Sequence, residues 1–120
     1  PEAYFNRAKV YDELDSLEAA KQDYRKAIKL KNDYAKAYHN LALLEKKSGN
    51  LTAAVDLLIK VISIESDSWK SHWILGQVYA QLGMTDKAEE SYSRAAALKP
   101  DSKKFWLEYN DLLKPKSEGK

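Results

Sequence analysis

Apolar side chains recur along the chain at the spacing of helices. In one stretch they lie at Leu75, Val78, Tyr79 and Leu82, three or four residues apart, which is the period of an amphipathic helix. Similar stretches follow one another, separated by short polar turns. The pattern therefore predicts an all-α chain of helices paired across short turns.

Turn residues separate the members of each helix pair. Gly49 and Gly83 follow the first helices of the second and third pairs, where glycine is a common helix stop. The first pair has no glycine there, and Asp15-Ser16 takes its place. We expect the following helices to be capped by Asp15-Ser16, by Thr52, and by Thr85 or Asp86.

The chain repeats itself at an offset of 34 residues, without gaps, over the windows 1–34, 35–68 and 69–102. Two positions in each window are small, one near its start and one in its second helix. These small residues are Ala8, Ala42 and Gly76 at the first position, and Ala20, Ala54 and Ala88 at the second. Small side chains at a helix crossing let two helices approach closely. Because a single pair cannot bury its apolar face, stacked repeats are expected.

The third window resembles the tetratricopeptide repeat, a family of 34-residue helix-turn-helix units. It carries the residues typical of that family, namely Leu75-Gly76, Tyr79, Ala88, Tyr92, Ala95 and Pro100. The other two windows depart from the pattern in places. Glu45 stands where tyrosine is usual, Ser66 replaces proline, and Arg7 replaces leucine.

This resemblance implies an all-α, right-handed superhelical solenoid of three helix pairs. One domain is expected over residues 1–113, with a capping helix at 102–113 and a flexible tail at 114–120. We expect the capping helix to cover the last repeat through Phe105, Trp106, Tyr109, Leu112 or Leu113.

Arg7 is the largest departure from the family pattern. A charged guanidinium needs water or a partner. Two interpretations remain open: this face of the first helix is not packed under another repeat, or Arg7 pairs with an acid in a part of the protein not present here.

Charge is balanced within each repeat, and the net charge of +2 falls on residues 103–120. A nucleic-acid-binding domain normally carries a basic stripe. The nearest candidate is on the second helix, and acids interleave it, so we interpret it as a solvated outer face and expect no nucleic-acid partner. Its residues are Lys21, Arg25, Lys26, Lys29 and Lys31.

No catalytic constellation is apparent in the sequence. Cysteine is absent, histidine occurs only at His39 and His72, and no glycine-rich phosphate loop occurs. His72 is expected to be a partly buried packing residue. We therefore expect no enzymatic activity, no metal and no cofactor.

Neither a long apolar run nor a signal peptide is visible, so no membrane insertion and a cytoplasmic location are expected. The chain begins at Pro1 rather than methionine, which leaves open that it is a processed piece.

In the tetratricopeptide repeat family, which these windows resemble, the first helices of successive repeats line a concave groove that holds a partner peptide. The positions expected to line that groove are Phe5, Lys9, Lys36, His39, Asn40, Leu43, Lys70, Trp73, Ile74 and Gln77. Phe5, His39 and Trp73 share one repeat position and are predicted to form a ladder of rings. In the alternative interpretation, Phe5 and Trp73 are packed under neighbouring side chains.

The predicted function is that of a protein-interaction module whose partner segment has apolar anchors and acidic flanks. A self-association element, using the groove or the end of the chain that carries Arg7, is the alternative. Binding of acidic chaperone tails is less expected, because only Asn40 and Lys70 match the five-residue carboxylate clamp of that subclass. Phe5, Lys9 and Ile74 stand at its other three positions.

Overall fold

The computed structural model describes residues 1–98 of the chain. The predicted capping helix at 102–113 and the tail at 114–120 lie outside the described residues. Within them every regular element is an α-helix, as predicted.

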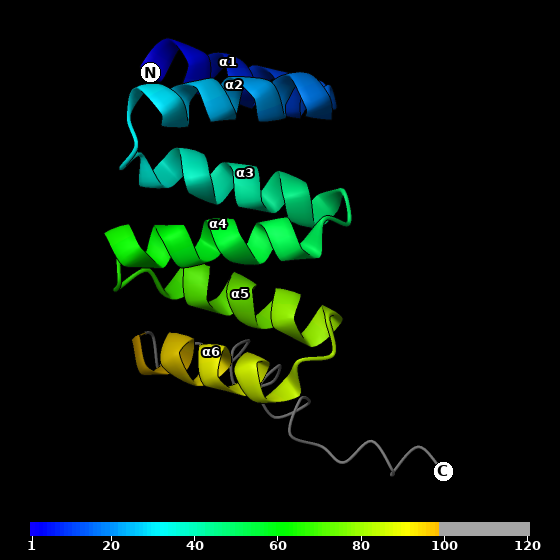
Figure 1. Cartoon of the computed structure of the whole chain (residues 1–120), viewed down its shortest axis with the longest axis vertical. Coiled ribbons are helices and arrows are strands. Elements are labelled where there is room, and N and C mark those ends of the chain that lie inside the picture. The colour runs from blue at the N-terminus through cyan, green and yellow to red at the C-terminus, as the bar shows by residue number, and fades with distance from the viewer. Residues whose placement is uncertain (99–120) are drawn as a thin grey trace. The chain divides into compact units, whose positions relative to one another are not determined.

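The chain divides into two compact units, Pro1–Ser66 and Asp67–Lys120. The first unit holds four helices and the described part of the second holds two, as labelled in Figure 1. They are α1 (Glu2–Glu13), α2 (Leu17–Leu30), α3 (Ala35–Lys47) and α4 (Leu51–Ile64), then α5 (Trp69–Gln81) and α6 (Thr85–Leu98).

Helices of the first unit pack in the order of the sequence. Helix α1 packs on α2, α2 on α3, and α3 on α4. Buried residues of α1, α2 and α3 form one core that includes the ring of Tyr24, and Leu57 of α4 packs against it partly buried. That core consists of Phe5, Ala8, Ala20, Tyr24, Ala27, Ala37, Leu41 and Leu44.

Small residues mark the helix crossings, as the sequence predicts. Ala8, Ala20 and Ala54 have no exposed surface in the first unit. In the second unit a Cβ atom on Gly76 would lie 2.9 Å from the ring of Tyr92. Because that distance is too short for two carbon atoms, glycine lets α5 approach α6 closely.

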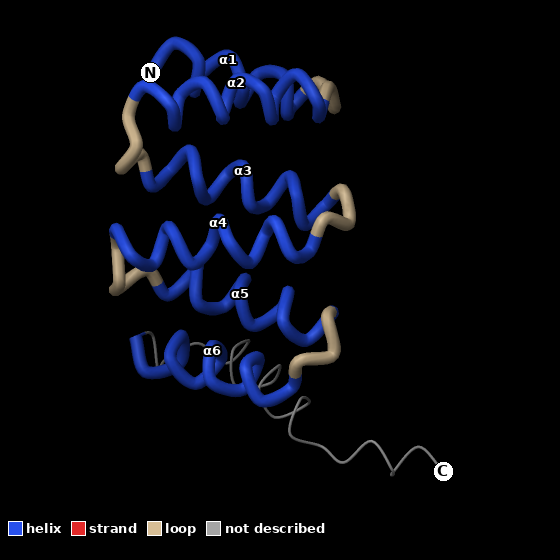
Figure 2. Tube along the Cα trace, in the orientation of Figure 1, coloured by secondary structure: helices blue, strands red, loops and turns tan. Residues whose placement is uncertain are grey.

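Turns inside the three helix pairs share one conformation at one repeat position. Asp15, Gly49 and Gly83 have φ angles of 63°, 86° and 78°. Figure 2 shows these turns as short tan segments at the ends of the paired helices. Aspartate is one of the few residues other than glycine that tolerate this left-handed region, which explains how the first repeat manages without glycine.

Helix caps differ partly from the sequence prediction. Helix α4 begins at Leu51 with Asn50 at its N-cap, so the prediction of Thr52 as a cap is wrong. Ser16 occupies the N-cap of α2 without a capping side-chain hydrogen bond. The side-chain cap of α5 comes from Ser68, whose hydroxyl oxygen accepts a hydrogen bond from the Ser71 amide at 3.4 Å.

Arg7 pairs with an acid inside the chain. Its Nε and Nη2 atoms donate to the two carboxylate oxygens of Asp23 on α2, at 2.6 and 2.9 Å. The prediction that its partner lies in an absent part of the protein is therefore wrong. The Arg7 side chain is half exposed, which agrees with the expectation that its charge needs water. The hydrogen bonds from Arg7 lower the pKa of Asp23, although burial of the carboxyl acts in the opposite direction.

A second group of charges joins α2 to α3. Lys21 and Arg25 contact the buried carboxylate of Glu45 at 3.0 and 3.1 Å, and the Asn50 side chain donates to it at 2.9 Å. Burial raises the pKa of Glu45, but the hydrogen bonds from Asn50 and Lys21 and the nearby positive charges outweigh it and lower the pKa. Lys21 is buried. The interpretation of Lys21 as part of a solvated outer face is therefore wrong.

Candidate functional site

The predicted groove residues of the first unit lie on α1 and α3, the first helices of their repeats. Lys9 and Lys36 are exposed, and His39 and Asn40 are half buried. The side chain of Leu43 is 37% exposed. These two helices therefore present apolar and basic groups to solvent at the predicted positions.

An open hollow of about 520 Å³ lies where α1 and α3 begin. It brings together the predicted residues Phe5 and Lys36, but not Lys9, His39, Asn40 or Leu43. Its lining is Glu2, Phe5, Asn6, Lys31, Asp33, Tyr34, Ala35, Lys36 and Glu65.

Several of these lining residues come from the connections that follow second helices. Lys31, Asp33 and Tyr34 belong to the α2–α3 connection, and Glu65 directly follows α4. Sequence reasoning assigned the groove to first helices alone and missed them. The short connections were the available signal, because they place the end of one repeat beside the first helix of the next.

Phe5 is a packing residue in this structure. Its ring is only 8% exposed and meets Tyr24 edge-on at 5.7 Å between centroids and Tyr34 at 5.0 Å. Trp73 is also 8% exposed, with the ring of Trp69 at 6.4 Å. The predicted ladder of groove-facing rings is therefore corrected: Phe5 and Trp73 are covered, as the alternative interpretation held.

The predicted residues of the second unit lie on α5. Lys70 is exposed, and its Nζ atom lies 5.8 Å from the centre of the Trp69 ring. Ile74 and Gln77 are half buried. His72 is buried, consistent with a packing role. Thus Lys70 is the most accessible of the predicted α5 positions.

Charges around the hollow are mixed. Glu2, Asp33 and Glu65 contribute carboxylates, against the ammonium groups of Lys31 and Lys36. The sequence predicts lysines beside the groove and therefore favours acidic ligands. The lining itself instead offers partners for side chains of both signs.

Asn40 is already engaged by the core. Its amide nitrogen donates to the hydroxyl oxygen of Tyr24 at 3.3 Å. Burial raises the pKa of Tyr24, and this hydrogen bond partly opposes the rise. Any ligand that uses the Asn40 amide must share or displace this contact.

A second hollow, of about 340 Å³, lies among α2, α3 and α4. Apolar side chains dominate its lining, with Arg25, Glu45 and Asp56 as its charged members. The apolar members are Ile28, Tyr38, Leu41, Ala53 and Leu57. Because second helices line it, this hollow is the alternative binding site that a test of the hollow at the start of α1 and α3 must distinguish.

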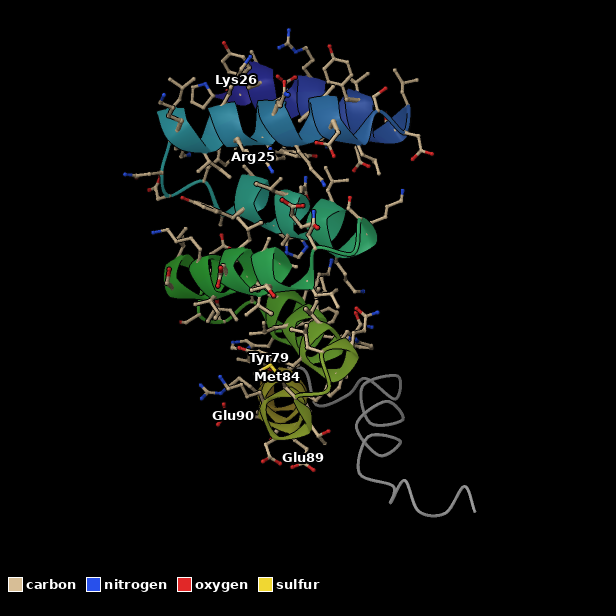
Figure 3. The ribbon with its side chains drawn as sticks, turned by 45° about the vertical axis from the view of Figure 1, so that its right-hand side comes forward. Arg25, Lys26, Tyr79, Met84, Glu89 and Glu90 are labelled. Carbon is tan, nitrogen blue, oxygen red and sulfur yellow. The ribbon has the colours of Figure 1, made fainter. Side chains whose placement is uncertain are left out.

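Residues 1–98 hold no group of three metal-ligating side chains. Glu89 and Glu90, the adjacent acids of α6, point away from each other in Figure 3 and do not form a carboxylate pair. Among the described helices, none is both long and apolar enough to cross a membrane.

Curated relatives share repeats with this chain but are much longer. The "Protein CTR9 homolog" of Arabidopsis thaliana is 29% identical over 115 residues, covering 92% of this chain and 10% of that protein. Human "Tetratricopeptide repeat protein 8" is 25% identical over 100 residues, covering 83% of this chain and 18% of the relative. The chain therefore spans less than a fifth of the length of either.

Solved structures share the fold at low sequence identity. MamA superposes with a TM-score of 0.90 at 24% identity, covering 98% of this chain and 68% of that one. The TPR domain of Arabidopsis OM64 gives 0.86 at 20% identity, with 93% of each chain covered. The first TPR of Spaghetti (RPAP3), bound to the HSP90 peptide SRMEEVD, gives 0.86 at 14% identity, covering 92% and 87%.

Family models named "Tetratricopeptide repeat" match all three windows, at residues 1–34, 35–68 and 69–102. Such repeats generally act as non-enzymatic scaffolds for protein interactions. The register of the matches agrees with the offset of 34 residues and with the helix pairs of the structure. The chain belongs to the tetratricopeptide repeat family.

Proposed function

We propose that the first unit binds a segment of a partner protein along the exposed face of α1 and α3. The observation that carries this proposal is the hollow of about 520 Å³, which joins predicted groove positions from both helices. Concave sites of this size range accept side chains or small ligands. Lys70, Ile74 and Gln77 on α5 are the corresponding candidates in the second unit, whereas Trp73 is covered.

Leu43 is the strongest candidate for an apolar contact, because Phe5 is covered whereas Leu43 is exposed on α3. A well-buried anchor at an interface contributes about 2 kcal/mol or more, whereas an exposed lysine–carboxylate pair contributes about 0.2–1 kcal/mol. Apolar contact therefore holds the segment, and the charged groups around it steer and orient it.

The partner segment we propose has an apolar anchor next to acidic side chains that face Lys9 and Lys36. Where it enters the hollow, basic side chains would meet Glu2, Asp33 or Glu65. This pattern refines the purely acidic flanks predicted from the sequence.

A matched pair of variants tests the site. Peptides selected from a display library against the whole chain are the probes, and affinity is measured by fluorescence anisotropy. Leu43→Glu is expected to weaken binding about thirty-fold, the equivalent of one lost anchor. Ile59→Glu, at an exposed apolar position of the second helix α4, is the control.

Equal losses from Leu43→Glu and Ile59→Glu would contradict the proposal, and so would a larger loss from Ile59→Glu. Lys36→Ala is expected to cost less affinity than Leu43→Glu. A larger effect of Lys36→Ala would reverse the assigned roles of anchor and steering charge.

The peptide-bound RPAP3 repeats suggest chaperone tails as a second class of ligand. In this chain only two of the five clamp positions match, and Asn40 of those two already bonds Tyr24. We therefore place this class behind a segment with an apolar anchor. The peptide SRMEEVD is the probe, and binding to it as tight as to the selected peptides would reverse that order.

A further inference from the structure

Tyr34 is an unusual residue for its place in the repeat. It occupies the N-cap of α3 and makes no capping side-chain hydrogen bond there. The equivalent residue one repeat later is Ser68, whose side chain does cap α5. Serine, threonine, asparagine and aspartate are the residues that stabilise a helix from this position. The first repeat therefore has an aromatic ring in place of a cap, and that ring lines the hollow at the start of α1 and α3.

The chain places one of its own cations on this ring. The Nζ atom of Lys31 lies 5.0 Å from the centre of the Tyr34 ring, within the range of about 6 Å at which an aromatic face attracts an ammonium group. Lys31 is exposed, and it forms no ion pair with any carboxylate of residues 1–98. Because a cation–π contact at an exposed site is weak, a ligand can displace the ammonium group from the ring.

Carboxylates without a partner lie around the same ring. Asp33 and Glu65 line the hollow, both are exposed, and neither forms an ion pair with another described residue. Burial raises the pKa of Tyr34, and the nearby charge of Glu2 raises it further. Carboxylates in the lining outnumber ammonium groups by three to two. The hollow therefore favours a cationic side chain over an anionic one.

This site does not depend on what precedes α1. Lys31, Asp33 and Tyr34 belong to one connection, with described helices on both sides. Lys36, the repeat equivalent of Glu2, stays exposed although α2 precedes it. A helix that packs before a first helix thus leaves this part of the repeat open.

Arginine suits the hollow better than lysine. A guanidinium group is planar, stacks on aromatic faces and is more weakly hydrated than an ammonium group. Its fork of N–H donors can also give a carboxylate two parallel hydrogen bonds. A lysine from a ligand would only repeat the contact that Lys31 already makes. An arginine gains the ring and a carboxylate at once.

We propose that the hollow at the start of α1 and α3 binds an arginine side chain of the partner segment. The guanidinium replaces the Lys31 ammonium over the Tyr34 ring and pairs with Asp33 or Glu65. Tyr34 thus determines which basic residue binds, and Lys31 competes with it. This inference rests on the proposed function, because it names the residue of that segment which enters the hollow.

Two capped tripeptides, Gly-Arg-Gly and Gly-Lys-Gly, are the probes, and nuclear magnetic resonance of the isotope-labelled chain follows their binding. They carry the same charge, so a difference between them does not arise from ionic strength or net attraction. The arginine peptide is expected to bind about three-fold more tightly than the lysine peptide.

Ring-current shifts report the exchange of cations directly, because an aromatic ring moves the signals of protons over its face upfield. The methylene protons beside the guanidinium of the bound arginine peptide should move upfield. The ε-methylene protons of Lys31 should return toward their ordinary position as Lys31 leaves the Tyr34 ring. This measurement uses the unchanged chain and needs no variant.

A matched pair of lysine variants tests the competition. Lys31→Ala is expected to strengthen binding of the arginine peptide about two-fold, because it removes both the competitor and a repelling charge. Lys29→Ala is the control, since Lys29 is an exposed cation near the end of α2 that does not line the hollow. It should leave the affinity unchanged.

Variants of the ring test its role in choosing the ligand. Tyr34→Ser gives the first repeat the residue that its neighbour has at this position, and it should abolish the preference for arginine over lysine. Tyr34→Phe keeps the ring and should keep the preference. Because Tyr34 packs partly buried against the core, thermal unfolding of Tyr34→Ser is measured alongside.

Equal affinities for the two tripeptides would overturn the proposal, and so would no measurable binding of either. Lys31 signals that do not move at saturation, or equal effects of Lys31→Ala and Lys29→Ala, would also overturn it. A preference for arginine that survives in Tyr34→Ser would place the arginine elsewhere. Each of these failures leaves the proposed function intact if Leu43→Glu still weakens the selected peptides more than Ile59→Glu.

Discussion

Helix α2 is joined to its two neighbours by different physical means. Toward α1, within the repeat, alanines allow close approach, and the charge pair Arg7–Asp23 lies at the margin with the guanidinium half exposed. Toward α3, between repeats, the pair Lys21–Glu45 is buried on both sides. The contact between repeats therefore contains a desolvated charge pair in addition to the shared apolar core, whereas the contact within a repeat relies on small side chains.

Breaking the buried pair is expected to have the largest effect on stability. Glu45→Ala leaves the ammonium of Lys21 buried with only the exposed carboxylate of Glu18, at 3.5 Å, as a partner. The free energy of unfolding should fall by about 3 kcal/mol, the lower end of the range for a broken buried pair. Urea unfolding followed by circular dichroism measures the loss. The double variant Lys21→Met with Glu45→Leu is the control, because it removes both charges and should restore most of the stability. A double variant as unstable as the single one would contradict this role of the pair.

Acidification is expected to have the next largest effect, because it protonates the carboxylates of Asp23 and Glu45. The folded-state pKa values of Asp23 and Glu45 lie below their ordinary values. Their stabilisation is thus fully present above the unfolded-state pKa and is lost as the pH falls through the folded-state pKa. Urea midpoints should fall as the pH drops below about 4. The double variant of Lys21 and Glu45 should show a shallower decline, and an identical decline would argue against Glu45 as a source.

Overpacking the joint within a repeat should cost less. Ala54→Leu places a larger side chain at a fully buried crossing and is expected to destabilise the chain by about 1–3 kcal/mol. Ala80→Leu, at an exposed position of α5, is the control and should change stability little. Thermal unfolding of both variants measures the effect. Equal midpoints would show that the crossing at Ala54 accommodates a larger side chain and would contradict the prediction.

Relieving the turn of the first repeat should produce the smallest effect. Asp15 adopts a φ of 63°, where Gly49 and Gly83 serve the other repeats. Asp15→Gly removes the conformational cost of placing a residue with a side chain in the left-handed region, which is roughly 1 kcal/mol. Loss of the exposed pair with Lys47 and the greater freedom of the unfolded chain offset part of that gain. A net stabilisation of a few tenths of a kcal/mol is expected, and a clear destabilisation would show that the Asp15 side chain matters to the turn.

Periodicity in the sequence was enough to predict the helix pairs, the repeat boundaries and the small residues at crossings. Gly76 against Tyr92 is an example, because the need for a small residue follows from the spacing alone. These features are local or repeat every 34 residues, so a single sequence contains them.

Contacts between helices were harder to predict. The sequence marks Arg7 and Glu45 as departures from the family pattern. It does not reveal that Asp23 forms an ion pair with Arg7 and that Lys21 forms one with Glu45. Exposure of the rings also depends on neighbours: Phe5 lies at a groove position but is covered by Tyr34 from the turn that follows α2. Pairing and burial depend on which residues of other helices come close, and helical spacing does not determine that.

Mapping the bound segment by amide chemical shifts tests the proposed function most directly. A selected peptide is titrated into the isotope-labelled chain, and the shifted residues are compared with the two hollows. The largest changes are expected at Glu2, Asn6, Lys36 and Leu43, on α1 and α3. Largest changes at Ile28, Ala53 and Leu57, around the hollow among α2, α3 and α4, would contradict the proposed site.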